Sequence, residues 1–320
     1  MSGNYSSFFF FKGRVALYAI LKTMGIKTGD EVILSGFTCV AVSNSIAYFG
    51  AKPVYVDIDL ATYNIDPSKI EEKITERTKV IIAQHTFGIP AEMDKILEIA
   101  IKYNLYVIED SCHALGSKYK GKEVGTFGDA AFFSSQWSKP VTTGLGGWAI
   151  INNPDLKEKM EKIYPEFIKP SFKETLLLRM QYLAYSLLLK PSLFWLIQDL
   201  YRRLSRWGIV IASSSNEELE CKLPEGYEKK MSSWQEKLLK IKLEKINQSI
   251  EHRMHITSLY EKLLTENAIK TVQLPDYYEI VFLRYPVIVK DKKKALEAAK
   301  KSKLELGDWF LSPLCQHMKG

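Results

Sequence analysis

Short apolar strands alternate with helical segments along the first 150 residues, and this alternation limits the fold more than any other feature. Apolar residues recur at helical spacing over 15–26, 40–49 and 92–103, and a further helix is expected over 66–74. Strands are expected over 31–34, 53–57, 80–84, 105–109, 130–134 and 147–151. Such alternation predicts an α/β fold, with a mostly parallel mixed sheet covered by helices.

Polar residues stand at the carboxyl ends of four of these strands: Asp57, His85, Asp110 and Ser134. In open α/β sheets, ligands bind outside the carboxyl ends of the strands. We therefore expect the chemistry of the protein at this edge.

The composition is that of a globular protein with a sizeable core. The chain has 320 residues, of which 46% are hydrophobic and 25% charged, so disordered, collagenous and solenoid classes are excluded. The formal net charge of +7 comes from short lysine runs that solvated helix surfaces explain, and we expect no nucleic-acid partner. This length fits one large domain and a smaller one.

Cysteine spacing and the first residues bear on the compartment. The four cysteines stand far apart without a CxxC pair or nearby histidines, so we expect no zinc site and a reducing cytoplasm. The opening MSGNYSSFFFFKGR has a four-residue apolar run, which fits neither a signal peptide nor a transit peptide.

Residues 165–211 form an unusually apolar helical stretch. Its longest run without charge, 180–189, has ten residues, far below the roughly 20 needed to cross a bilayer, and Pro191 interrupts it. A buried helical hairpin and a surface patch for a partner or a membrane both fit this pattern.

The rest of the chain predicts a smaller α+β unit. A linker is expected at 213–216, and one or two long amphipathic helices over 232–264. Strands are expected at 280–283 and 285–289, followed by a helix over 292–301.

Three polar residues suit one cofactor. No GxGxxG follows the first strand, and TTGLGG (142–147) lacks the ending of a Walker loop. Pyridoxal 5'-phosphate (PLP) instead needs a lysine for its aldehyde, a carboxylate for its ring nitrogen, and hydroxyl or backbone N–H groups for its phosphate. Lys139, Asp110 and Ser134 supply these groups.

An ordered set of segments covers residues 13–153 almost continuously. It comprises GRVAL (13–17), GDEVIL (29–34), FTCVAV (37–42), GAKPVYVDID (50–59), NIDPSKIEEKITERTKVII (64–82), HTFGIPAEMDKI (85–96), IEDSCHALGSKYKGKEVGTFGDAAFFS (108–134) and KPVTTGLGG (139–147). This set resembles the DegT/DnrJ/StrS family of PLP-dependent sugar aminotransferases, which have fold type I.

The resemblance implies roles for individual residues. Lys139 corresponds to the lysine that binds the cofactor covalently, and Asp110 to the partner of the pyridine nitrogen. His113 replaces a glutamine near the 3-hydroxyl of the ring, where an imidazole N–H can donate; a purely structural histidine is the alternative. Ser134 and the backbone N–H groups of Arg14 and Val15 correspond to the phosphate cradle, in keeping with the anion affinity of helix N-termini.

Four positions depart from the family pattern. Gln136 replaces a histidine, and Cys39 replaces an aromatic residue on the cofactor face, where an ordinary core cysteine fits equally well. Leu145 replaces the glutamate of the TTGEGG turn. Residues 228–231 (EKKM) replace Asn-x-Arg-Met, whose polar groups reach the cofactor of the neighbouring subunit; Lys230 can meet a phosphate there, whereas Glu228 would repel one.

The resemblance also implies an overall organisation. Residues 1–235 correspond to a large PLP-binding domain with a helical insertion at about 160–215, and residues 236–320 to a smaller α+β domain. Relatives continue for several dozen residues more, so the small domain is expected to be incomplete. A homodimer with active sites near its interface is implied.

The implied reaction is transfer of an amino group, from glutamate, to a nucleotide-linked keto sugar in polysaccharide or amino-sugar biosynthesis. Two alternatives stay open. A PLP-dependent sugar dehydratase is disfavoured by Lys139, because related dehydratases have histidine at that position. A non-catalytic or regulatory binding protein on the same scaffold is favoured by the altered 228–231 segment and disfavoured by the intact Asp110, Ser134 and Lys139.

Overall fold

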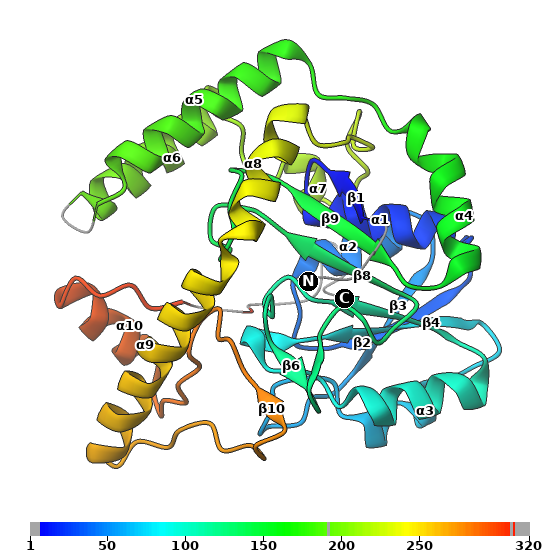
Figure 1. The fold of residues 1–320 in the computed structure, drawn as a ribbon, viewed down its shortest axis with the longest axis horizontal. Helices are drawn as coiled ribbons and strands as arrows, with labels where there is room; N and C mark the ends of the chain where they lie inside the picture. The colour runs from blue at the N-terminus through cyan, green and yellow to red at the C-terminus, as the bar shows by residue number, and fades with distance from the viewer. Residues whose placement is uncertain (1–6, 191–192, 308–309, 311–320) are drawn as a thin grey trace.

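The computed structural model describes residues 7–190, 193–307 and 310, and its centre is a seven-stranded sheet (Figure 1). The spatial order is β1 (Ser7–Phe10), β9 (Gly147–Ile151), β8 (Ala130–Ser134), β5 (Tyr106–Asp110), β4 (Thr78–Gln84), β2 (Glu31–Ser35) and β3 (Lys52–Val56). The neighbours from β3 to β8 pair in parallel, whereas β9 is antiparallel to both β8 and β1. The expected α/β architecture with a mostly parallel sheet is therefore confirmed.

Helices cover both faces of this sheet because successive strand residues point to opposite sides. One face packs against α1 (Gly13–Thr23), α2 (Val40–Ala47) and α4 (Pro154–Ile163), with Val32 and Leu34 of β2 in that core. Ile33, between them, belongs to the second core, where α3 (Met93–Tyr103) packs. Strands that are buried on both faces explain the continuous apolar runs of the sequence.

One strand in this domain was missed from the sequence, and one helix was predicted wrongly. The missed strand is β1, which adds the apolar run near the N-terminus to the sheet as an edge strand beside β9. The helix expected over 66–74 is a pair of 3-10 turns, Pro67–Lys69 and Glu71–Lys73. Between Pro67 and Lys73 the only aliphatic side chain is Ile70, so the segment has no apolar stripe with which a full helix could pack.

The predicted linker runs into a short helix, α7 (Asn216–Leu219). Two long helices follow, α8 (Ser233–Glu244) and α9 (Ile246–Glu266), and later α10 (Lys292–Lys301). A small sheet joins β10 (Tyr278–Glu279) to β6 (Lys118–Tyr119) and β7 (Lys122–Glu123).

The strands predicted at 280–283 and 285–289 are wrong. Their backbone donors turn to loops: Val281 N–H donates to Ser117 Oγ at 2.9 Å, and Leu283 N–H to the Phe87 carbonyl at 2.8 Å. The predicted division at residue 235 stays a prediction.

The apolar insertion forms a hairpin of α5 (Phe172–Leu188) and α6 (Phe194–Arg206) at the periphery of the molecule (Figure 1). The interpretation as a buried hairpin is wrong, because Leu178 is the one buried residue of α5 and large apolar side chains of both helices are exposed. Among the described residues, no helix is long and apolar enough to cross a membrane.

Candidate active site

A cavity of about 460 Å³ lies at the carboxyl ends of β5 and β8, beside the N-terminus of α1. Seven of the eight residues predicted for the cofactor line it: Arg14, Cys39, Asp110, His113, Ser134, Gln136 and Lys139. Val15 does not, since its side chain packs in the core and its N–H donates to the Lys12 carbonyl at 3.1 Å. Of the other strand-end residues, Asp57 is exposed and pairs with Lys69 at 3.1 Å, away from the cavity.

Lys139 and Asp110 bring an amine and a carboxylate to the same cavity. Lys139 follows β8 in a turn that its own N–H closes on the Gln136 carbonyl at 2.9 Å. Burial lowers the pKa of Lys139, although the charge of Asp110 opposes that shift. Burial raises the pKa of Asp110, whose Oδ1 accepts the Cys112 N–H at 3.1 Å. A buried carboxylate of this kind favours a cationic partner.

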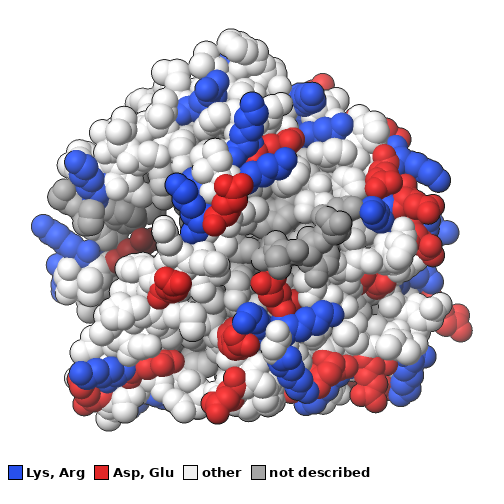
Figure 2. Space-filling view, viewed as in Figure 1, with Lys and Arg blue, Asp and Glu red and all other residues white. Residues whose placement is uncertain are grey.

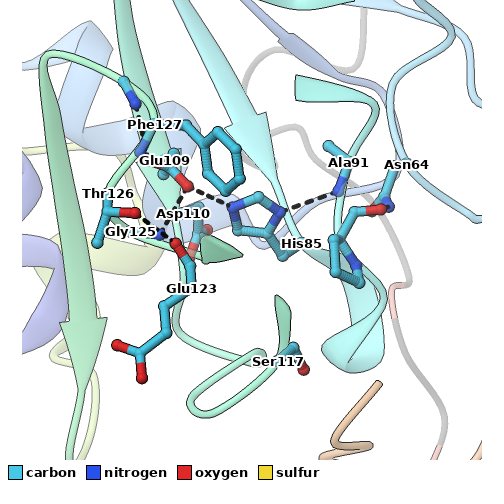
Figure 3. A network of polar contacts seen from close by, with 12 residues as sticks. Asn64, His85, Ala91, Glu109, Asp110, Ser117, Glu123, Gly125, Thr126 and Phe127 are labelled. Atoms are coloured by element: carbon cyan, nitrogen blue, oxygen red, sulfur yellow. Dashed lines mark hydrogen bonds and ion pairs between the residues drawn. The ribbon is translucent and has the colours of Figure 1, made fainter. Parts of the chain in front are cut away.

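A buried polar network fixes the end of the strand that carries Asp110 (Figure 3). Glu109 accepts the backbone N–H groups of Gly125, Phe127 and Gly128 at 2.6, 2.6 and 2.8 Å. His85, fully buried, contacts Glu109 through Nε2 at 3.0 Å.

The Nδ1 atom of His85 accepts the Ala91 N–H at 3.0 Å, so the ring proton is on Nε2 and is donated to Glu109. His85, a strand-end residue expected to take part in chemistry, therefore has a structural role. Because His85 N–H also donates to the Asp110 carbonyl at 3.1 Å, the network holds the backbone of Asp110 in register.

His113 presents a neutral imidazole to the cavity. Burial lowers its pKa well below the ordinary value, and the charges of Lys139 and Arg284 add to the effect. Nδ1 accepts the Phe87 N–H at 3.4 Å, so the proton of the neutral ring is on Nε2. The ring is parallel to that of Phe310, with centroids 6.1 Å apart.

The other end of the cavity is built to meet an anion. Gly13 allows α1 to begin directly against β8, because a Cβ there would lie 3.1 Å from the Ser134 Cβ and the Phe133 carbonyl. Gly147 on β9 also leaves room for the start of α1, since a Cβ on Gly147 would overlap the backbone of Gly13. The N-terminus of α1 and the Ser134 hydroxyl therefore come together.

Two cationic side chains that share one carboxylate lie at this end, Lys12 and Arg14. Only the backbone N–H of Arg14 was named from the sequence, and neither side chain was predicted. Arg14 contacts Glu218 at 2.9 Å and Ser214 Oγ at 3.0 Å, while Lys12 Nζ lies 3.1 Å from the second oxygen of Glu218. Burial acts to raise the pKa of Glu218, but Arg14 and Lys12 hold it below the ordinary value. The acidic pair at 217–218, directly after the predicted linker, was the sequence feature that could have pointed to a carboxylate partner for these cations.

The structure shows where three of the residues that depart from the expected motif lie. Cys39 is exposed to the cavity at the start of α2, so it is not a core cysteine. Gln136 donates its N–H to Ser134 Oγ at 3.4 Å. Leu145 is buried with Leu178 of α5, so the inserted hairpin provides the apolar surface that this leucine packs against.

The 228–231 segment does not line the cavity of its own chain. Glu228 accepts from Lys22 at 2.9 Å and from the Tyr18 hydroxyl at 3.1 Å, both on α1. Lys230 donates to the Pro165 carbonyl at 3.3 Å. Within one chain, neither side chain reaches the anion-binding end.

The model of the DegT/DnrJ/EryC1/StrS aminotransferase family matches residues 10–187 and 195–319. The chain belongs to this family. The cavity described above, with its lysine, its carboxylate and the N-terminus of α1, therefore belongs to a protein of this family.

Two curated relatives and one solved structure are similar to the chain. GDP-perosamine synthase from Escherichia coli O157:H7 is 48% identical over 147 residues, which cover 46% of this chain and 40% of that protein. GDP-perosamine synthase from Caulobacter vibrioides is 45% identical over 159 residues, covering 50% and 43%. The chain spans about two fifths of the length of the curated relatives it matches.

The crystal structure of the aminotransferase TlmJ from Streptoalloteichus hindustanus superimposes with a TM-score of 0.72 and 21% identity, covering 98% of this chain and 73% of its own. At 21% identity this similarity shows the fold alone. The chain has the fold of the PLP-dependent aminotransferases.

Proposed function

We propose that the protein is a PLP-dependent sugar aminotransferase, and that it transfers an amino group from glutamate to a nucleotide-linked keto sugar. The observation that carries this proposal is the placing of Lys139, Asp110 and Ser134 around one cavity with the N-terminus of α1. Family membership and relatives named GDP-perosamine synthase support the sugar substrate.

The donor and acceptor groups of the cavity fit PLP. Ser134, Arg14 and the positive end of α1 suit a phosphate at one end of the cavity, and Asp110 suits a protonated ring nitrogen in the interior. When bound, PLP supplies an aldehyde that carries the amino group and a ring that withdraws electrons from the reacting carbon.

The residues of the chain have distinct tasks in this proposal. Because burial lowers the pKa of Lys139, its amine loses a proton more readily than an exposed lysine; it can bind the aldehyde and then move a proton at the substrate carbon. Asp110 keeps the ring nitrogen protonated. The neutral His113 could donate a hydrogen bond from its Nε2–H to the oxygen on the ring of PLP.

A cation near the lysine bears on the amino donor. Arg284 lies close enough for its charge to lower the pKa of both Lys139 and His113. Its guanidinium lies 3.6 Å from Glu305, so a carboxylate of glutamate would compete with that residue for the same cation. Assembly as a homodimer and a cytoplasmic location stay predictions of the sequence.

The test is the absorption spectrum of the protein with added PLP, followed by borohydride reduction and peptide mapping. We expect a visible band and a pyridoxyl group fixed on Lys139. Lys139→Ala should lose both, while the matched control Lys79→Ala, an exposed lysine of β4, should keep them. A band that persists in Lys139→Ala would show that another lysine binds the cofactor. No band in the folded protein would favour the non-catalytic alternative.

A further inference from the structure

Helix α5 is apolar on both of its faces. Its inner face packs on the site: Leu178 is buried beside Leu145, and the Tyr185 hydroxyl donates to the Trp137 carbonyl at 3.2 Å. The outer face carries five exposed apolar side chains at spacings of three or four residues, namely Phe172, Leu176, Met180, Leu183 and Leu187. A helix that is hydrophobic all round is normally buried, so this exposed face needs a partner.

Helix α6 and the residues after it extend the same kind of surface. Leu196 is 67% exposed and Trp207 is 70% exposed, and Trp195, Leu200 and Ile209 are exposed as well. Tryptophan is enriched where a protein meets a membrane interface, since its ring is apolar and its N–H is polar. With 17 residues in α5 and 13 in α6, the helices have the length to lie on a bilayer, not to cross it.

The charge around this surface is positive. Residues 165–211 contain seven Lys and Arg against three Asp and Glu. Among the side chains that the structure describes here, the exposed basic residues of the hairpin and of the segment leading into it are Lys169, Lys173, Arg179, Lys190 and Arg203. Of the acidic residues, Glu174 is neutralised by Lys229 at 2.6 Å and Glu166 contacts Lys22 at 3.4 Å. The edge where Figure 1 places α5 is white and blue at the upper left of Figure 2.

This charge distinguishes between possible occupants. In a two-fold symmetric dimer, the same patch faces itself, so two positively charged hairpins would repel one another. An anionic lipid surface attracts the basic residues, by about 1 kcal/mol for each Lys or Arg near it, while the apolar side chains enter the acyl boundary.

We propose that the α5–α6 hairpin docks the protein onto the surface of an anionic membrane. The outer face of α5, together with Leu196, Leu200 and Trp207, lies at the boundary between headgroups and acyl chains. Tyr185 contacts the backbone two residues before Lys139, so the element that meets the lipid also supports the loop of the candidate active site. The proposal does not depend on the activity proposed above.

The test uses the full chain and vesicles of phosphatidylcholine, with or without phosphatidylglycerol. We expect the protein to sediment with the anionic vesicles, to bind neutral vesicles at least tenfold more weakly, and to be released by high salt. The tryptophan fluorescence of the protein should shift to the blue on binding, and the double variant Trp195→Phe, Trp207→Phe should remove most of that shift.

Substitutions distinguish binding through the outer face of α5 from nonspecific hydrophobic adsorption to vesicles. The triple variant Met180→Gln, Leu183→Gln, Leu187→Gln should bind anionic vesicles at least tenfold more weakly. The matched control, Met254→Gln, Leu259→Gln, Leu263→Gln on α9, removes three exposed apolar side chains of another helix and should bind normally.

Equal binding to neutral and anionic vesicles, or equal loss in both triple variants, would overturn the proposal. So would a dimer in solution that dissociates only in the α5 variant, since that result would assign the face to a second copy of the chain.

Discussion

The guanidinium of Arg14 lies 2.9 Å from a carboxylate oxygen of Glu218, although 204 residues separate them in the chain. The carboxylate is 2% exposed, and its other oxygen contacts Lys12. Because Arg14 lines the cavity at its anion-binding end, Glu218 neutralises part of the positive charge that a phosphate would meet. The segment after the hairpin thus sets the electrostatics of a site formed by the first helix.

Glu218→Gln should make this end of the cavity more positive. We expect inorganic phosphate to bind about tenfold more tightly, since an additional charge-assisted contact becomes available to it. The free energy of unfolding without phosphate should fall by about 3 kcal/mol, because two partly buried cations lose their counter-charge. Calorimetry measures the binding and urea denaturation the stability.

The matched control for this change is Glu220→Gln, an exposed residue that pairs with Lys222 at 2.8 Å. It should alter neither quantity. If Glu218→Gln weakened phosphate binding instead, Glu218 would serve to position Arg14 and not to compete for it.

Asp110→Asn should separate cofactor binding from catalysis. The amide is nearly isosteric and keeps the cavity filled, but it cannot hold a ring nitrogen in its protonated form. We expect PLP to be retained and the transfer from glutamate to PLP to slow by at least about a hundredfold. Single-turnover absorption spectroscopy follows this step.

Asp57→Asn is the matched control, as an exposed carboxylate directly after β3. The Asp57→Asn variant should transfer the amino group from glutamate to PLP at the wild-type rate. A full rate in Asp110→Asn would refute the assignment of Asp110 as partner of the ring nitrogen.

His113 should make the fold sensitive to mild acid. Burial keeps its pKa low in the folded protein, whereas an unfolded histidine binds a proton near pH 6.5. Stability from this residue is therefore complete above about pH 6.5 and is lost as pH falls toward the folded-state pKa, with a slope of at most about 1.4 kcal/mol per pH unit. Urea denaturation of His113→Gln at several pH values should show a shallower loss.

His252→Gln, which changes an exposed histidine of α9, should behave like the wild type in the same series. Parallel pH profiles for the wild type and His113→Gln would mean that His113 takes up its proton in the folded protein as easily as in the unfolded chain.

Leu178→Ala should loosen the hairpin from the body of the protein. Leu178 is fully buried between Leu145 and Phe11, and removal of a buried leucine side chain costs about 2–5 kcal/mol. We expect limited proteolysis to cut residues 165–211 faster. Leu176→Ala, on the exposed face of the same helix, should leave the rate unchanged; equal acceleration in both would mean that the inner face does not hold the hairpin.

The alternating pattern of strands and helices was readable from the sequence because each element carries its own periodicity. Buried strands such as β4 and helices such as α3 are local in this sense, and the carboxyl ends of the strands follow from the pattern. The strand ends therefore indicate the edge on which Asp110 and Ser134 lie, whereas Lys139 follows from the chemistry of PLP and from the resemblance to the family. The strands predicted at 280–289 failed because their donors bond to loops distant in the chain.

The sequence by itself determined six of the seven strands of the central sheet, the functional edge and the polar residues along it, because local periodicity and residue chemistry encode them. Only the tertiary structure decided that Glu218 forms an ion pair with Arg14, that His85 donates a hydrogen bond to Glu109, and that Leu145 packs with Leu178. These pairings join residues from 24 to 204 positions apart, and no local pattern records them, since packing of whole elements brings such side chains together.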